Sequence, residues 1–132
     1  MATTRKQHVQ SNFELKAWDE ETYADDPRLV RATVSKLYSG DVLAVSTSEY
    51  VMAYADDGTA TFVGLEHITG TIGDRAGTLV LQHVGTYADG VARASVMADP
   101  AASTDDLAGV QVTGSFAATS GPNGTVELDL TF

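Results

Sequence analysis

The stretch "FVGLEHITGTIGDRAGTLVLQHVGTY", from Phe62 to Tyr87, contains the strongest evidence for the fold. Apolar and polar residues alternate along both of its arms, and the dipeptide Gly73-Asp74 separates the arms. Alternation with a period of two is typical of a strand with one buried face, and a glycine-containing dipeptide between two such runs indicates a tight turn. The stretch therefore predicts an antiparallel β-hairpin that directs one face toward a core.

The same alternation recurs elsewhere and predicts an all-β protein with little or no helix. In "VELDLTF" (Val126–Phe132) every second residue is apolar, and "NFELKAW" (Asn12–Trp18) places Phe13, Leu15 and Ala17 on one face. Short turn signals and two longer acidic connections, at about 19–28 and 99–108, separate the runs. The predicted strands are 8–18, 29–39, 43–55, 59–70, 77–87, 91–98, 109–119 and 124–132.

Eight antiparallel strands joined mainly by hairpins predict a single closed β-barrel over residues 1–132, with residues 1–7 flexible. Closure is favoured because it removes exposed strand edges. The interior of an eight-stranded barrel is either filled by side chains or holds one small ligand.

The formal net charge is −10, from 18 acidic and 8 basic residues. This balance repels phosphate backbones and argues against nucleic-acid binding. The acidic residues concentrate at Trp18–Asp26, Ala55–Gly58 and Asp99–Asp106. These clusters could bind calcium or a basic partner, but none has the ligand spacing of an EF-hand, which favours solvated loops.

Several other classes are disfavoured by composition. The chain has no cysteine, so disulfides and thiolate metal sites are unavailable. No apolar run approaches the roughly 20 residues of a membrane helix, and the basic N-terminus lacks the apolar segment of a signal peptide. A zinc site is disfavoured, because no three potential metal ligands share a predicted face. The glycine-containing stretch "GTIGDRAG" is not followed by a helix, so it does not match a phosphate-binding loop. We therefore expect a cytoplasmic protein without metal or cofactor.

The hairpin turn sets which residues face each other. A two-residue turn at Gly73-Asp74 pairs Glu66 with Leu81 and makes His83 a diagonal neighbour of Glu66, with Cβ atoms about 7 Å apart. A slip of one residue would replace His83 by Gln82 on that face. The face with Glu66 also carries phenylalanine, leucine and glycine, so we predict that it lines the interior.

The turn "DDG", at Asp56–Gly58, sets how the predicted strand 43–55 pairs with the strand that carries Glu66. A three-residue loop with Gly58 in the left-handed conformation places Tyr50 on the Glu66 face, whereas a tight Asp57-Gly58 turn would bring Glu49 opposite Glu66. We favour the longer loop, because glycine suits that position. Trp18 lies at a strand end, where it could stack on a ligand at the barrel mouth or cover the core. The predicted ligand-binding residues are Trp18, Tyr50, Met52, Tyr54, Phe62 and Leu81.

Glu66 and His83 are the candidate catalytic residues. Burial raises the pKa of a carboxyl group and a protonated histidine nearby lowers it, so the pair could donate or accept a proton near neutrality, given a histidine pKa of about 6.5. The alternative is a buried hydrogen bond that only satisfies two polar groups of the core.

Five segments carry a family resemblance: "KAWDEETY", "LVRATVSKLYSGD", "YVMAYADDGTATFVGLEHITGTIGDRAG", "LVLQHVGTYADG" and "LAGVQVTGSF". In this order they resemble a bacterial family of small uncharacterised proteins in the allene-oxide-cyclase-like β-barrel superfamily. The resemblance implies the barrel but no function of its own. Cyclases of that superfamily hold an apolar substrate inside the barrel and guide ring closure with few polar groups.

Two functional classes follow from a barrel with a ligand in its interior. A third class, a protein that acts through its surface, applies if side chains fill the interior. The protein is either a cofactor-free cyclase or isomerase, in which Glu66 or His83 moves a proton, or a non-catalytic carrier of a small apolar or aromatic compound.

The opposite face of the hairpin predicts self-association. Val63, Leu65, Val80 and Val84 would form an exposed apolar patch, which usually marks an interface. We expect a homo-oligomer, in the simplest case a dimer. Light scattering at high protein concentration checks this, and a monomeric mass would contradict it.

Overall fold

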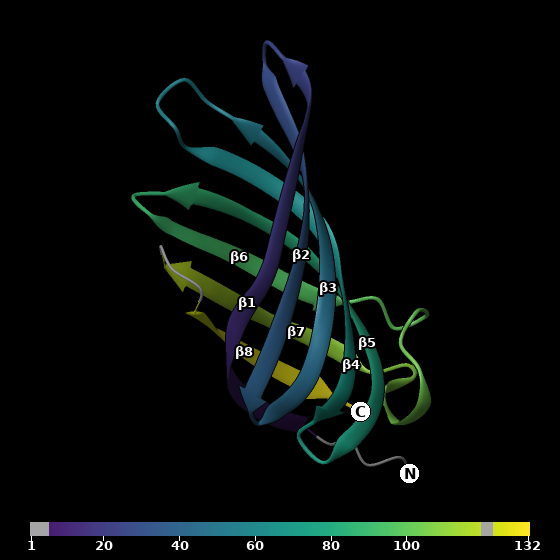
Figure 1. The fold of residues 1–132 in the computed structure, drawn as a ribbon. Helices are drawn as coiled ribbons and strands as arrows, with labels where there is room; N and C mark the ends of the chain where they lie inside the picture. Colours follow the sequence, from purple (N-terminus) through teal and green to yellow (C-terminus); the bar gives the residue numbers. More distant parts are fainter. Residues whose placement is uncertain (1–5, 120–122) are drawn as a thin grey trace.

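The computed structural model describes residues 6–119 and 123–132, which form a closed antiparallel barrel of eight strands (Figure 1). Each strand pairs with the next, and the last pairs with the first, which confirms the predicted fold. The strands are β1 (Lys6–Asp25), β2 (Arg28–Gly40), β3 (Val42–Tyr54), β4 (Ala60–Ile72), β5 (Arg75–Ala88), β6 (Val91–Ala98), β7 (Gln111–Thr119) and β8 (Asn123–Thr131).

The described helix content is a single 3₁₀ turn, η1 (Asp105–Leu107). No helix in the described ranges is long and apolar enough to cross a membrane. Of the stretch predicted to be flexible, 1–7, residues 1–5 lie outside the described part. Lys6 and Gln7 belong to β1 and pair with Thr131 and Leu130 of β8.

The register of β3, β4 and β5 is the predicted one. Glu66 pairs with Leu81 across the β4–β5 hairpin, and Ser48 of β3 pairs with Glu66 on the other side. The amide of Ala55 donates to the carbonyl of Thr59 across the three-residue loop, in which Gly58 has a φ of +87°. These pairings place Tyr50, Phe62 and His83 on the buried face.

Glycines on β4 and β5 make room for aromatic side chains in the interior. A Cβ atom on Gly64 would lie 2.6 Å from Cδ1 of Tyr50, and one on Gly85 would lie 2.6 Å from Cζ of Phe62. Each glycine therefore lets a ring from the neighbouring strand lie directly over the backbone.

The prediction of an acidic connection at 19–28 was wrong, because β1 continues to Asp25 and pairs with β2 along this length. Residues 19–22 are exposed, and Glu21 lies opposite Arg31. A strand with both faces in water needs no apolar alternation, so the sequence signal that identifies the other strands is missing here. Figure 1 shows this hairpin extending beyond the other turns.

A register shift in β1 also changes which residues face inward. Leu15 pairs with Lys36, but the next pair is Ala17 with Ser35, and Trp18 then pairs with Val34. The extra residue reverses the alternation, as a β-bulge does. Ala17, expected beside Phe13 and Leu15, therefore lies on the outer face, and Trp18 turns inward.

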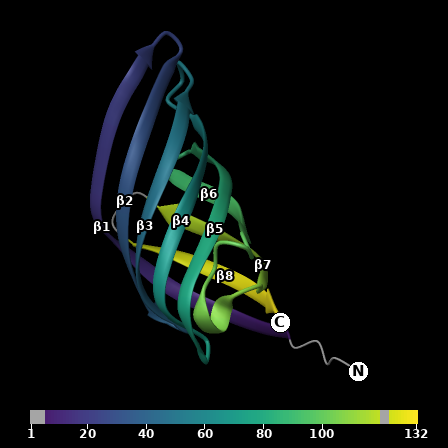
Figure 2. The same cartoon turned by 90° about the vertical axis from the view of Figure 1, so that its right-hand side faces the viewer.

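The segment between β6 and β7 covers the half of β5 that β6 does not reach (Figure 2). The amide of Asp99 donates to the carbonyl of Val80, and the amide of Thr104 donates to the carbonyl of Thr78. Leu107 of this segment is fully buried in the core. Val80 is consequently half-buried, so the prediction that it is exposed was wrong. The predicted exposure of Val63, Leu65 and Val84 is confirmed.

Candidate functional site

A pocket of about 420 Å³ lies inside the barrel, and its lining includes Trp18, Glu20 and Tyr54. These residues lie toward the end of the barrel that carries the β1–β2 and β3–β4 hairpins; Figure 1 shows the two hairpins at one end. The walls of the pocket are mainly aromatic, and its inner end carries the polar groups of Lys36 and Tyr50. The aromatic wall residues besides Tyr50 are Phe13, Trp18, Tyr54, Phe62, Tyr87 and Phe116. A larger hollow of about 850 Å³ is lined mostly by outward-facing side chains such as Thr86, Ser95 and Glu127, and it is an open surface groove.

Most of the predicted ligand-binding residues line the inner pocket, namely Trp18, Tyr50, Met52, Tyr54 and Phe62. Leu81 is buried in the core and is not part of the described lining. Glu66 and His83 also lie behind the lining, 1% and 2% exposed. The candidate catalytic pair is therefore in contact with the pocket only through other side chains.

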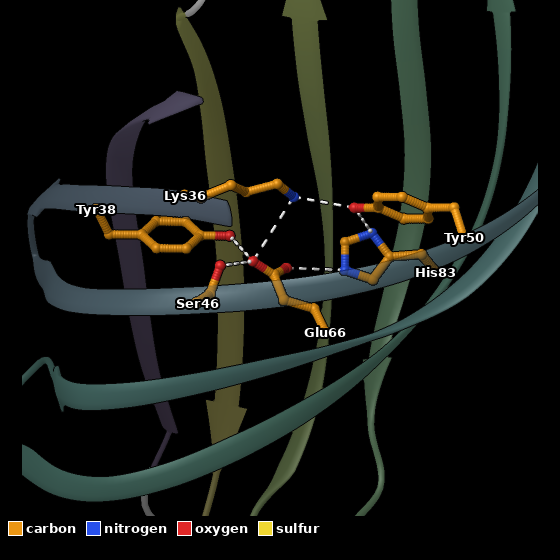
Figure 3. Close-up of polar contacts among 6 residues, drawn as sticks. All are labelled: Lys36, Tyr38, Ser46, Tyr50, Glu66 and His83. Atoms are coloured by element: carbon orange, nitrogen blue, oxygen red, sulfur yellow. Dashed lines mark hydrogen bonds and ion pairs between the residues drawn. The ribbon is translucent and has the colours of Figure 1, made fainter. Parts of the chain in front are cut away.

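Glu66 is the centre of a buried polar network formed by β2, β3, β4 and β5 (Figure 3). Its Oε2 accepts hydrogen bonds from Tyr38 Oη at 2.5 Å and Ser46 Oγ at 2.7 Å. Its Oε1 lies 2.9 Å from His83 Nε2. The ammonium of Lys36 lies 3.6 Å from Oε2 and completes the set. Both carboxylate oxygens are occupied, so Glu66 has little capacity left for a ligand.

Sequence reasoning did not single out three residues of this network, Lys36, Tyr38 and Ser46, and Lys36 is the charged one among them. It is 4% exposed, and its Nζ donates a hydrogen bond to Tyr50 Oη at 2.9 Å. Rings of Phe13 and Phe116 each lie 4.9 Å from the ammonium. A signal was present: in β2 the residues two apart, Val30 to Tyr38, all face inward, and Lys36 is the one charged member of this series.

Tyr50 joins the pocket to the buried pair. Its hydroxyl lies 3.5 Å from His83 Nδ1, and the other ring nitrogen of His83 faces Glu66. If Nε2 carries the ring hydrogen and donates a hydrogen bond to Glu66, Nδ1 is free to accept a hydrogen bond from the hydroxyl of Tyr50. The result is a chain of hydrogen bonds, Glu66–His83–Tyr50, that ends at the pocket.

The charges of the network follow from burial and from Lys36. Burial alone would raise the pKa of Glu66, but the attraction of Lys36 and the bonds from His83 and Tyr38 outweigh it, and the pKa is lowered to about 2. Burial opposes the charge on Lys36 as well, yet Glu66 and Tyr50 raise its pKa above the usual value. Burial lowers the pKa of His83 despite the bond to Glu66. At neutral pH the site holds one cation, one anion and a neutral imidazole.

This arrangement is suited to proton transfer at Tyr50 and to hydrogen bonding by Lys36. A carboxyl group with a pKa of about 2 is a weak base, so Glu66 serves better as the counter-ion that keeps Lys36 and His83 in place. The described residues contain no group of three histidines or carboxylates that could hold a metal ion.

Comparisons with known proteins agree with the fold and supply no activity. A crystal structure of a protein of unknown function from the DUF3224 family of Shewanella oneidensis matches with a TM-score of 0.80 and 27% sequence identity, over 97% of this chain and 98% of that one. No curated protein matches the sequence. The family model described as "Protein of unknown function (DUF3224)" matches residues 9–132, and the chain therefore belongs to the DUF3224 family.

Proposed function

We propose that the barrel binds a small apolar or aromatic compound in its inner pocket and acts on it as a cofactor-independent isomerase or cyclase. The pocket itself carries this proposal, because it combines aromatic walls with two polar groups, Lys36 and Tyr50, at the inner end. Large apolar surfaces provide affinity, and a few polar groups provide orientation. The resemblance to allene-oxide-cyclase-like barrels supports the reaction class by analogy only.

In such a reaction Tyr50 is the group that exchanges a proton with the substrate. The O–H bond of Tyr50 breaks as the proton joins the substrate, and the phenolate that forms faces the ammonium of Lys36 at 2.9 Å. A proton leaving another carbon of the substrate then restores Tyr50, so the net change is an isomerisation. Glu66 and His83 act as positioning residues behind Tyr50.

The alternative is a carrier that binds the same class of compound without changing it. The aromatic walls support a carrier equally well, but a carrier has no need of the buried chain from Glu66 to Tyr50. Tyr50→Phe and Glu66→Gln distinguish the two. For an enzyme, substrate turnover falls a hundredfold or more while binding is retained. For a carrier, ligand affinity is the one functional property that these changes can alter.

Binding can be tested before any substrate is known, because Trp18 is the single tryptophan and lines the pocket. We expect the neutral probe N-phenyl-1-naphthylamine to bind and to accept excitation energy from Trp18. Ala118→Phe, which fills the pocket, should abolish this transfer. Ala117→Phe on the outer face of β7 is the matched control and should preserve it. Equal transfer in both variants would place the probe elsewhere and overturn the proposal.

A further inference from the structure

The hydrogen-bonding capacity of Lys36 at the inner end of the pocket is incompletely used. An ammonium has three N–H donors. One donates to Tyr50 Oη, and a second faces Glu66 Oε2 at the long distance of 3.6 Å. The described residues offer no third acceptor, and Lys36 is otherwise surrounded by the rings of Phe13, Tyr50 and Phe116. A ligand that brings an acceptor atom to this point gains a hydrogen bond to a charged donor, shielded from water.

The charge of the site restricts what that acceptor can be. The positive charge of Lys36 is already balanced by Glu66, and a second anion would have to share the same ammonium. At the pocket mouth the Glu20 carboxylate accepts a hydrogen bond from Trp18 Nε1 at 2.8 Å, and the chain as a whole has a net charge of −10. Both features repel an entering carboxylate. A cationic ligand would instead meet Lys36 at the inner end.

We propose that the pocket takes an uncharged aromatic or apolar carbonyl compound, whose carbonyl oxygen accepts a hydrogen bond from Nζ of Lys36 beside Tyr50. This inference rests on the proposed function and names its substrate class. A carbonyl oxygen accepts without adding charge, and the aromatic walls hold the remainder of the molecule. Polarisation of the carbonyl by the ammonium also makes neighbouring C–H bonds more acidic, which suits a proton shift through Tyr50.

Three naphthalenes of closely similar shape test the proposal by isothermal titration calorimetry at pH 7. These are the ketone 2-acetylnaphthalene, its oxygen-free analogue 2-isopropenylnaphthalene and the anion 2-naphthoate. We expect the ketone to bind roughly tenfold more tightly than the alkene, and the carboxylate to bind more weakly than the ketone. The infrared carbonyl stretch of the ¹³C-labelled ketone should move to lower frequency on binding, which reports the hydrogen bond directly.

A double variant removes the donor while keeping the site uncharged overall. In Lys36→Met/Glu66→Gln the ketone and the alkene should bind with equal affinity, and the infrared shift should disappear. Lys16→Met/Glu14→Gln makes the same two changes in an exposed ion pair with a separation of 3.2 Å. This control should retain both the tenfold preference and the infrared shift. If the double variant at Lys36 does not fold, the infrared shift in the unaltered protein still decides.

The outcomes separate the two proposals. If the alkene binds but the ketone shows no preference and no infrared shift, or if 2-naphthoate binds as tightly as the ketone, the carbonyl inference is wrong and the proposed binding function stands. If none of the three compounds binds, both are wrong.

Discussion

Replacing Lys36 with methionine is expected to lower the free energy of unfolding by about 3–5 kcal/mol, the range for breaking a buried ion pair by removing one partner. Methionine fills similar space, so the loss comes from electrostatics and not from a cavity. Glu66 would remain 1% exposed with hydrogen bonds from Tyr38, Ser46 and His83 but without its ammonium partner. Urea unfolding at pH 7, followed by circular dichroism, measures the change.

Two further variants isolate the cause. Lys36→Met/Glu66→Gln removes both charges and should recover a large part of the lost stability, because a neutral pair leaves no buried charge uncompensated. Lys16→Met breaks an exposed ion pair with Glu14 and should cost less than about 1 kcal/mol. A loss in Lys36→Met no larger than in Lys16→Met, or a double variant less stable than the single one, would show that Glu66 does not depend on Lys36.

Acidification is expected to destabilise the barrel in two steps. The pKa of Glu66 is lowered from 4.5 to about 2 in the folded protein, so the unfolded chain binds the proton more readily. The contribution of ionised Glu66 to the free energy of unfolding is complete above about pH 4.5 and is lost as pH falls toward 2. A pKa shift of this size corresponds to a contribution on the order of 3 kcal/mol. The pKa of His83 is lowered from 6.5 for a different reason, namely burial, so the unfolded chain again binds the proton more readily and a first loss of stability begins below pH 6.5.

Urea unfolding at a series of pH values between 7 and 2 tests this dependence. Lys36→Met/Glu66→Gln should have a flatter profile below pH 4.5, because the titrating carboxyl group has been removed. Lys36 does not contribute within this range: its pKa is raised, so its stabilisation is present below pH 10.5 and is lost only in more alkaline solution. Identical profiles for the double variant and the unaltered protein would assign the acid transition to other groups.

The sequence by itself determined the barrel and the register of its central strands. Alternation and turn residues are local properties: the two-residue turn at Gly73-Asp74 was enough to pair Glu66 with Leu81, and Gly58 fixed the loop that places Tyr50 on the same face. The common face of Glu66 and His83 followed, since a strand has only two faces.

Only the tertiary structure decided the charges and the free volume at the inward face that carries Glu66 and His83. The pKa of Glu66 depends on Lys36, which lies 30 residues earlier in the chain and reaches the carboxylate because β2 to β5 curve around one interior. The bulge in β1 that turns Trp18 inward changes no turn signal, and the paired residues 19–25 lack alternation because water covers both faces. The free volume beside Tyr50 depends on side chains from all around the closed barrel, and no local pattern encodes such a volume.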